Sequence, residues 1–340
     1  MDSPTDSPEV SVIVPARNEE ASLADCLSTL AGQAGVSYEV IVVDDDSTDH
    51  TRAIAESFSV RVIAADPLPE GWSGKCNAAW SGARIARGHW LLFTDADTKH
   101  SPDSIAGGLQ EAKESSADLL SYSPKQQVVS LAERALMPVI FAELATTYPP
   151  KQVSDPAFPV AAANGQYLLI RRETYDAIGG HAAAATSILE DVELAKRAKQ
   201  AGHSLRFRMS DVVTTRMYRS FREMWEGWTK NLALLFPNAR NLAVKRAIEF
   251  VVIVVAAAFA IVSALQGQML ACAIAAAVTV QWCYLFWKRI QLAHFDSLSN
   301  ALSLFGLPLF AVLLWNSGIS HKRGLVRWKG REYAVPTASH

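Results

Sequence analysis

The chain has 340 residues, half of them hydrophobic, and a formal net charge of −2 at pH 7, so it can form one large domain or two. It has no basic patch interleaved with aromatic residues near its acidic clusters, which argues against a nucleic acid partner. Its four cysteines show no C-x-x-C spacing, which argues against a zinc site or a disulfide framework. Residues 1–9 are acidic and rich in Pro and Ser, without the apolar core of a signal peptide. We therefore expect a disordered N-terminus followed by a cytoplasmic domain.

Residues 10–120 alternate short β-rich runs with amphipathic helical patterns. This rhythm is typical of an α/β fold in which helices cover a mostly parallel sheet. Ligands bind such sheets at the carboxyl ends of the strands, which places three loops, 15–19, 44–49 and 95–98, at the expected binding edge. The expected strands are 10–15, 38–43, 60–63 and 89–94, and the expected helices are 19–30, 48–58 and 75–87.

The middle of the chain is more mixed. Residues 128–144 form an apolar, amphipathic stretch that ends at Tyr148-Pro149-Pro150. Such a stretch fits a helix on a membrane surface and equally a helix packed inside the domain. We expect a strand at 166–170 and a helix at 189–201, which Gly202 ends.

Three apolar segments follow residue 240, at 247–265, 269–287 and 298–319. Each is long enough to cross a hydrocarbon core of about 30 Å. The sequence therefore predicts a first domain over 10–240, transmembrane segments within 241–320 and a basic tail over 321–340.

Basic pairs mark the ends of the first two apolar segments. Lys245-Arg246 precede the first segment and Lys288-Arg289 follow the second, while the linker between them is uncharged. The positive-inside rule puts both pairs in the cytosol. The basic tail favours the same side, whereas a single third crossing would place it outside. A re-entrant third segment, broken at Gly306 and Pro308, would resolve this conflict.

Asp95 and Asp97 follow the expected strand 89–94 directly. In an extended segment, residues i and i+2 point to the same side, so both carboxylates can face one cation. A Mg²⁺ ion held by one or two carboxylates usually keeps its other positions for water and substrate phosphates. The pair therefore points to a metal that carries a diphosphate. By itself, such a pair is more often part of a turn or a helix cap.

Five ordered motifs together resemble the family 2 glycosyltransferases of the GT-A fold, a Rossmann-like α/β fold. Gly71-Trp72-Ser73-Gly74-Lys75, the apolar C-terminal segments and the stretch 326–333 narrow the resemblance. They are similar to the membrane-bound branch that glycosylates lipids, such as carotenoid-acid, hopanoid-associated and ceramide glycosyltransferases. The motifs are VIVPARNEE (12–20), VVDDDSTD (42–49), GWSGK (71–75), FTDAD (93–97) and ILEDVEL (188–194).

The resemblance implies a role for each acidic site. Asp97 and Asp95 would hold Mg²⁺ or Mn²⁺ at the diphosphate of the donor. Asp191 would be the general base for the acceptor, with Glu190 as second choice. Taken alone, Asp191 is better explained as a carboxylate at a helix N-terminus, which the helix dipole favours.

The resemblance also implies a set of substrate-binding residues. Asp46 departs from it, because the family usually has a small residue there. Asp44, Asp45 and Ser47 are also explained as caps of the helix expected at 48–58, and both roles can hold if one side chain caps while another binds. Lys75 could balance the charge of the diphosphate or be a solvated lysine at a helix start, and His181 is expected to be structural. The implied substrate-binding residues are Pro15, Arg17, Glu19, Asp44, Asp45, Ser47, Lys75, Asp95 and Gly180.

A signature that follows the base in processive synthases and ceramide enzymes is incomplete here. Arg219 and Arg222 keep the spacing of its two polar positions, but Trp does not follow Arg222. This argues against a processive polymerase and against a strict ceramide glucosyltransferase. Arg219 and Arg222, with Trp225 and Trp228, suit a lipid interface and are predicted to contact the acceptor.

The sequence therefore predicts an inverting enzyme that transfers one sugar from a UDP-sugar, with UDP-glucose as first choice, to a membrane lipid. It predicts a multi-pass protein of the cell (inner) membrane with a cytoplasmic catalytic domain. Three alternatives remain: transfer to polyprenyl phosphate, a catalytically silent sugar-nucleotide-binding partner and, with least support, a transporter.

Overall fold

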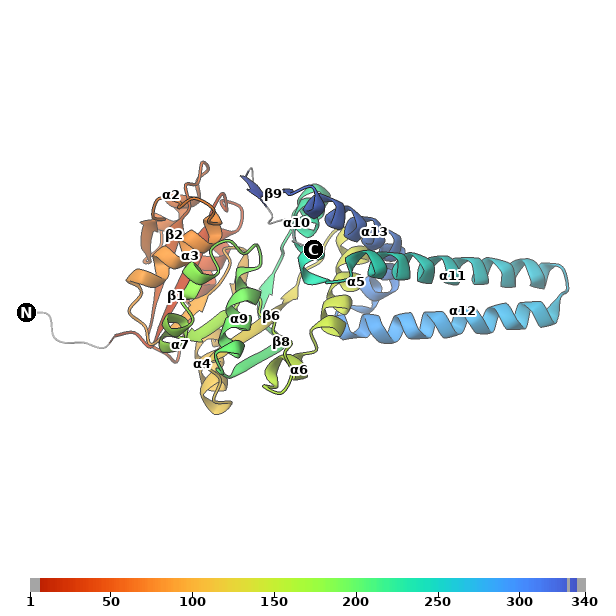
Figure 1. Ribbon diagram of the computed structural model, residues 1–340, viewed down its shortest axis with the longest axis horizontal. Helices are drawn as coiled ribbons and strands as arrows, with labels where there is room; N and C mark the ends of the chain where they lie inside the picture. The colour runs from red at the N-terminus through yellow and green to blue at the C-terminus, as the bar shows by residue number, and fades with distance from the viewer. Residues whose placement is uncertain (1–6, 329–330, 335–340) are drawn as a thin grey trace, which may run out of the picture. The chain divides into compact units, whose positions relative to one another are not determined.

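The computed structural model describes residues 7–328 and 331–334, which divide between two compact units (Figure 1). The sheet unit comprises the described residues up to 127 and residues 150–217. The helical unit comprises 128–149 and the described residues from 218 onward. Residues 128–149 and 218–240, which we expected in the first domain, thus group with the C-terminal helices. Parts of the expected disordered N-terminus (1–6) and basic tail (329–330 and 335–340) lie outside the described residues.

The sheet unit is built on one eight-stranded sheet with the order β3-β2-β1-β4-β7-β6-β8-β5. The first four strands in this order pair in parallel, as predicted. β7 and β5 are antiparallel to their neighbours, so the sheet as a whole is mixed. The strands are β1 Val10–Ala16, β2 Tyr38–Asp44, β3 Arg61–Ala64, β4 Trp90–Phe93, β5 Thr98–His100, β6 Leu119–Gln126, β7 Leu168–Arg171 and β8 Leu205–Thr215.

Helices pack against the sheet of this unit (Figure 1). The predicted helices are present with shifted ends; α2 begins at Thr51 rather than at residue 48, and α1 at Leu23 rather than at 19. The helices are α1 Leu23–Ala31, α2 Thr51–Glu56, α3 Gly74–Ile85, α4 Ser104–Glu114, α6 Pro150–Ser154, α7 Arg172–Ala177, α8 Gly180–Ala183 and α9 Glu190–Gln200.

The two faces of β1 carry different helices because successive side chains of a strand alternate between faces. Val10, Val12 and Val14 belong to a buried core that includes Leu27 of α1. Ile13 points to the opposite face, toward α3. There Gly82 permits close packing, since a Cβ on it would lie 2.7 Å from a methyl carbon of Ile13.

The direction of β7 determines which loop lies at the predicted binding edge of the sheet. β7 runs antiparallel to β4, with Leu168 opposite Phe93. Its amino end therefore lies beside the carboxyl end of β4. The loop that precedes β7, with Gly165, is thereby brought to the same edge as the loop that follows β4, with Asp95.

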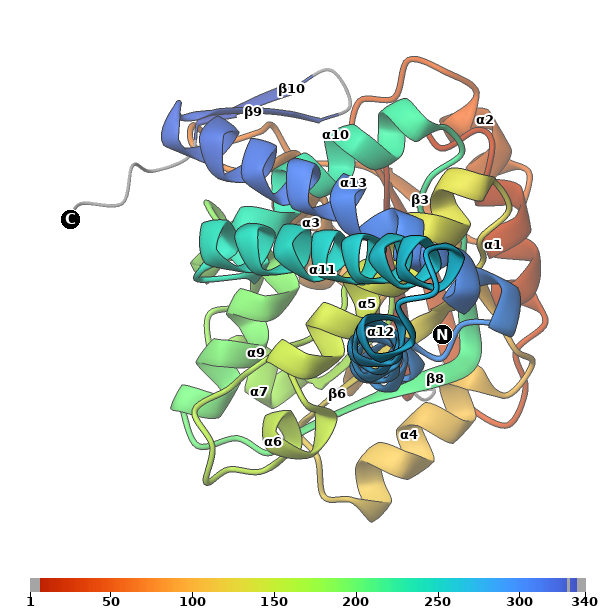
Figure 2. The ribbon, with the colours of Figure 1, turned by 90° about the vertical axis from the view of Figure 1, so that its right-hand side faces the viewer.

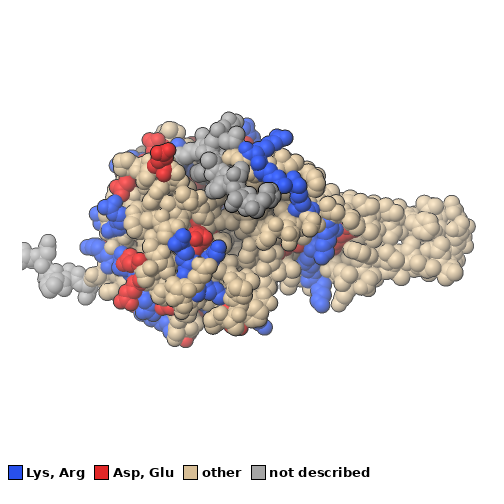
Figure 3. All heavy atoms as spheres, viewed as in Figure 1, with Lys and Arg blue, Asp and Glu red and all other residues tan. Residues whose placement is uncertain are grey.

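The helical unit contains long helices and a short two-stranded sheet. α11 and α12 form an antiparallel pair that projects beyond the other helices of this unit (Figure 1), and Figure 2 looks nearly along α12. No charged residue occurs between positions 250 and 287, and the projecting part is accordingly uncharged in Figure 3. The elements are α5 Leu131–Thr147, α10 Phe221–Leu235, α11 Ala239–Leu265, α12 Met269–Ile290, η1 Gln291–Ala293, α13 Ser297–Lys322, β9 Leu325–Trp328 and β10 Arg331–Ala334.

α13 is one continuous helix, so the break that we considered at Gly306 and Pro308 does not occur. Pro308 lies inside the helix, and Gly306 lets it approach α5 closely, because a Cβ on Gly306 would lie 1.9 Å from the Ala135 carbonyl oxygen. Half of the most apolar 18-residue window of α13 is buried, against 17% for α11 and 11% for α12. By length and composition all three helices are able to cross a membrane, but α13 differs from the other two in its packing.

Four charged side chains form a buried cluster where α5, α11 and α12 meet. The guanidinium of Arg246 lies 2.8 Å from a Glu143 oxygen and 2.9 Å from a Glu249 oxygen. Arg289 reaches the same two carboxylates at 3.0 and 2.9 Å. Two arginines thus match two glutamates, which is the condition under which buried charges are tolerated. We call these residues the arginine–glutamate cluster.

Candidate active site

A narrow pocket opens at the carboxyl ends of β1 and β4. Its free volume is about 10 Å³, close to the space that one water molecule requires. Four charged side chains that the sequence singled out, Lys75, Asp95, Glu190 and Asp191, meet there. The lining residues are Pro15, Lys75, Ala79, Phe93, Thr94, Asp95, Gly165, Leu168, His181, Glu190 and Asp191.

Asp191 lies in the first turn of α9 and is fixed by backbone donors. The Gly165 N–H donates to its Oδ2 at 2.7 Å, and the Val192 N–H donates to its Oδ1 at 2.8 Å. Burial, followed by repulsion from Glu190, raises the pKa of Asp191 to about 6. Asp191 thus lies at a helix N-terminus, as the alternative based on the helix dipole expected. It also has the raised pKa that suits a proton acceptor near neutral pH.

Lys75 pairs with two carboxylates across the pocket. Its Nζ lies 2.8 Å from Asp95 Oδ1 and 2.8 Å from Glu190 Oε1. Lys75 belongs to the first turn of α3, where Ser73 caps the helix by accepting from the Cys76 N–H. Its side chain is 42% exposed, so it is neither a freely solvated lysine nor a buried one. The motif around Lys75 was recognised in the sequence, but these two partners were not.

A buried polar network holds the loop that carries Asp95. Thr98 Oγ1 donates to the Asp95 carbonyl at 2.7 Å, and Thr94 Oγ1 donates to the Gln166 carbonyl at 2.8 Å. His100 Nε2 lies within 3.2 Å of both threonine hydroxyls. Burial lowers the pKa of His100 to about 4, so the ring is neutral at pH 7. This hydrogen-bond network was not predicted from the sequence, because no spacing rule identifies a polar side chain that packs beneath an acidic loop.

The loops after β1 and β2 hold each other. Arg17 Nη1 donates to the Asp45 carbonyl at 2.6 Å, and the Asn18 N–H donates to Ser47 Oγ at 3.1 Å. Asp44 is buried and accepts from the Ser47 N–H at 3.3 Å. The residues predicted to bind nucleotide are therefore ordered by contacts between the two loops, which keeps them at the strand ends.

The start of α2 carries a hydrogen bond to a side chain outside the predicted set. Asp49 Oδ1 accepts from the Thr51 N–H at 2.9 Å, and the N-cap residue, His50, makes no side-chain cap hydrogen bond. Asp46 has φ of 58°, a left-handed conformation in which glycine is the usual residue. This explains why the family has a small residue there, and Asp is among the few others that tolerate it. Glu19 lies beside α1, where it accepts from Ser22 Oγ at 3.0 Å.

Gly180 is required by packing. Its φ is 50°, and an added Cβ would lie 2.5 Å from the ring of Tyr175. The Tyr175 hydroxyl lies 2.9 Å from Nδ1 of His181, whose pKa is lowered to about 4 by burial. The structural role expected of His181 fits these contacts, although its side chain also lines the pocket.

The remaining predicted residues lie outside the pocket lining. Arg219 and Arg222 belong to the helical unit, where Arg222 pairs with Glu226 at 2.8 Å. Their predicted contact with the acceptor stays a prediction. In the sheet unit, the predicted residues outside the lining are Arg17, Glu19, Asp44, Asp45, Ser47, Asp97 and Gly180.

The carboxylates at this edge fit a hard divalent cation whose other coordination positions are filled by a bound ligand and water. Asp95 and Asp97 are both half-buried on the loop after β4, and carboxylate oxygens are what Mg²⁺ and Mn²⁺ prefer. Among the described residues, no group of three or more His, Cys, Asp or Glu side chains is placed to hold a metal. One or two carboxylates are, however, all that Mg²⁺ takes when phosphates and water supply the other positions.

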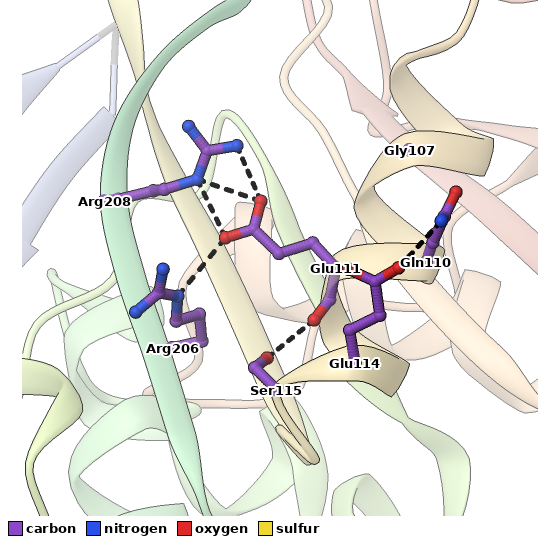
Figure 4. A pocket seen from close by; sticks show the side chains of 7 residues that line it. All are labelled: Gly107, Gln110, Glu111, Glu114, Ser115, Arg206 and Arg208. Carbon is purple, nitrogen blue, oxygen red and sulfur yellow. Dashed lines mark hydrogen bonds and ion pairs between the residues drawn. The ribbon is translucent and has the colours of Figure 1, made fainter.

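A second hollow, between α4 and β8, has a different character (Figure 4). It is a shallow, open hollow of about 600 Å³, and its central carboxylate, Glu111, is already matched by Arg208 at 2.6 Å and Arg206 at 3.2 Å. None of the five sequence motifs contributes to its lining. We therefore assign the chemistry to the pocket at the strand ends.

Comparison with known proteins places the chain among glycosyltransferases. Residues 11–179 match the model of the glycosyl transferase family 2. The 4,4'-diaponeurosporenoate glycosyltransferases of Staphylococcus aureus strains MRSA252 and USA300 are each 26% identical to this chain. Each alignment covers 96% of this chain and 88% of the relative. A mannosyltransferase from Pyrobaculum calidifontis, solved with GDP-Man and Mn²⁺, aligns with a TM-score of 0.54. It is 18% identical, over 93% of this chain and 88% of that structure.

The sheet topology and these matches define a glycosyltransferase with a GT-A-like fold, followed by apolar C-terminal helices. Within that class, residues 11–179 form a domain of glycosyl transferase family 2.

Proposed function

We propose that this glycosyltransferase transfers a single hexose from a UDP-sugar, with inversion, to a hydroxyl or carboxylate of a membrane lipid. The observation that carries the proposal is Asp191, a carboxylate with raised pKa held by the Gly165 N–H in a pocket shared with Asp95. The relatives that act on 4,4'-diaponeurosporenoate support a lipid acceptor.

In this proposal the two sides of the pocket have separate tasks. Asp191 accepts the proton of an acceptor hydroxyl as the oxygen attacks the anomeric carbon, and its two backbone hydrogen bonds hold it in place. Asp95 and Asp97 would hold Mg²⁺ or Mn²⁺, which neutralises charge on the leaving diphosphate. The Asp44–Ser47 loop, ordered against Arg17 and Asn18, would receive the nucleoside.

The helical unit supplies the proposed membrane attachment. α11 and α12 are long, mostly exposed and apolar, and basic pairs flank them at residues 245–246 and 288–289. We propose that these two helices cross the cell membrane with both basic pairs in the cytosol. α13 buries half of its apolar window and keeps Leu298, Phe305 and Val312 exposed at seven-residue spacing along one side. It therefore fits a helix that lies along the membrane surface rather than a third crossing.

The activity is tested with detergent-purified protein, Mn²⁺, a panel of UDP-sugars and total lipid from the source cell, followed by mass spectrometry. The expected product is a lipid plus one hexose that is lost with EDTA, restored by Mg²⁺ or Mn²⁺ and absent with Asp97→Asn. A product that persists fully in EDTA would remove the metal from the proposal. Turnover retained by Asp191→Asn would favour polyprenyl phosphate, an acceptor that is already an anion. UDP-sugar binding without any product would favour the silent sugar-nucleotide-binding partner.

The topology is tested with single cysteines in a cysteine-free protein, labelled by a membrane-impermeant maleimide in sealed right-side-out vesicles. We expect a cysteine at Gln268 to react from outside and cysteines at Asp296 and Arg323 to react only after lysis. Reaction of the Arg323 position in sealed vesicles would instead show that α13 crosses the membrane.

A further inference from the structure

Lys75 pairs with one of the two carboxylates that are proposed to hold the cation. Its Nζ lies 2.8 Å from Asp95 Oδ1, one of the two oxygens that Asp95 can offer to a cation. An added Cβ at Gly165 would lie 3.1 Å from this Nζ and 3.6 Å from Asp191 Oδ2. The ammonium thus sits among the carboxylates that surround Gly165, and the pocket around it has only about 10 Å³ of free space.

We propose that Lys75 and the divalent cation compete for Asp95, and that the nucleotide diphosphate resolves the competition by drawing the ammonium onto itself. This inference rests on the proposed function and adds to it an order of binding. Without nucleotide, the lysine occupies Asp95 and the cation binds weakly. With nucleotide, the phosphates offer the ammonium an alternative anion, and Asp95 is released to the cation.

The charges of the pocket support this exchange. The Lys75 ammonium pairs with Asp95 and Glu190 and lies close to Asp191. When Lys75 leaves Asp95, the cation replaces its charge there, and Glu190 at 2.8 Å still anchors the lysine close to the pocket. An ammonium on a flexible four-carbon stem suits such a move, because it acts as a compact point charge without fixed bonding geometry. Lys75 is therefore a positioning residue whose displacement couples two ligands.

Coupling between two ligands is reciprocal, so UDP must tighten Mn²⁺ by the same factor by which Mn²⁺ tightens UDP. We would measure free Mn²⁺ by electron paramagnetic resonance, and UDP affinity by calorimetry, for the full-length protein in detergent. For the wild type we expect UDP to tighten Mn²⁺ by about tenfold or more, within the usual range of such coupling. For Lys75→Gln we expect Mn²⁺ without nucleotide to bind about tenfold tighter, and the coupling to shrink toward one.

Matched variants separate competition from a general change of charge. Lys113→Gln removes the same charge from a lysine that pairs with Glu9, at the amino end of β1, and is expected to bind Mn²⁺ like the wild type. Lys75→Arg keeps the charge and is expected to keep nucleotide-free binding weak. In an Asp95→Asn background, Lys75→Gln is expected to leave Mn²⁺ affinity unchanged, because the shared ligand is gone.

The outcomes distinguish the inference from the function on which it rests. Thermal unfolding in the same detergent verifies that each variant is folded. If folded Lys75→Gln binds Mn²⁺ without nucleotide no more tightly than the wild type, the competition is wrong, while the proposed transfer is untouched. An equal effect of Lys75→Gln with and without Asp95 would also overturn it. If the wild type binds no Mn²⁺ even with UDP, the metal-dependent function itself fails.

Discussion

The two units of this protein each gather charged side chains in a cluster, and the clusters differ in balance and in exposure. In the arginine–glutamate cluster, two arginines match two glutamates, and the carboxylate side chains are at most 3% exposed. In the pocket of the sheet unit, the described residues place Lys75 against the two carboxylates of Asp95 and Glu190, with Asp191 close by, and the lysine side chain is 42% exposed. A balanced, buried cluster joins helices, whereas an unbalanced and accessible one is suited to receive a cation and an anionic ligand. The predictions below test this difference.

The largest effect is expected from the base of the unbalanced cluster. Asp191→Asn keeps the shape of the side chain and its hydrogen bond from Gly165 but cannot accept a proton. Transfer to a lipid hydroxyl should fall about 10²- to 10⁴-fold, with the thermal unfolding temperature preserved. A folded variant with near wild-type turnover would show that Asp191 is not the base.

A substitution in the arginine–glutamate cluster should lower the stability of the protein rather than act on the transfer reaction directly. Arg246→Met leaves Glu143 and Glu249 facing one arginine in a buried position, and breaking a buried pair in this way costs about 3–5 kcal/mol. We expect a clearly lower unfolding temperature in detergent. Arg222→Met, which removes an exposed arginine paired with Glu226 within the same unit, serves as the control and should unfold like the wild type. Equal unfolding temperatures for the two variants would contradict a structural role of the cluster.

Packing of α13 on α5 gives a smaller effect with a control in the same helix. Gly306→Ala places a methyl group 1.9 Å from the Ala135 carbonyl oxygen, whereas a methyl group at Gly318 meets nothing within 4 Å. The first change should destabilise the protein by about 1–3 kcal/mol through overpacking. Gly318→Ala should be neutral or stabilising by up to about 1 kcal/mol, because alanine is the better helix former. Unfolding in detergent of both variants tests the packing, which would be disproved if they did not differ.

The pH dependence of transfer gives the mildest test. Burial and Glu190 raise the pKa of Asp191 to about 6, and the base must be deprotonated to act. With a hydroxyl acceptor, kcat/KM should therefore be level above this pKa and fall about tenfold for each pH unit below it. The residual activity of Asp191→Asn should lack this acid limb. A wild-type profile that stays level well below pH 6 would argue against a carboxylate with raised pKa as the base.

The sequence predicted most of what repeats locally and little of what depends on distant contacts. Strands β1 and β2 and the three apolar helices followed from periodicity and length. The antiparallel direction of β7, which brings Gly165 to Asp191, could not be predicted in this way. A strand's direction depends on its pairing rather than on its own residues. Motifs pointed to Lys75, Asp95, Glu190 and Asp191, but the Lys75 contacts and the His100 hydrogen-bond network arise only when separate segments meet. The start of α2 at Thr51, where Asp49 accepts from the first backbone N–H of the helix, was not predicted, because several neighbouring side chains offer similar acceptors.

The uncharged turn between α11 and α12 has a consequence for how the protein is made. Only residues 266–268 separate the two helices, and they carry no charge. If the pair inserts as one hairpin, the insertion machinery has to move only this short turn across the bilayer, and no folded domain has to follow it. The sheet unit, apart from residues 150–217 all synthesised before α5, can then fold on the side where it is translated. Insertion of this hairpin would thus export no charged residue between the two helices.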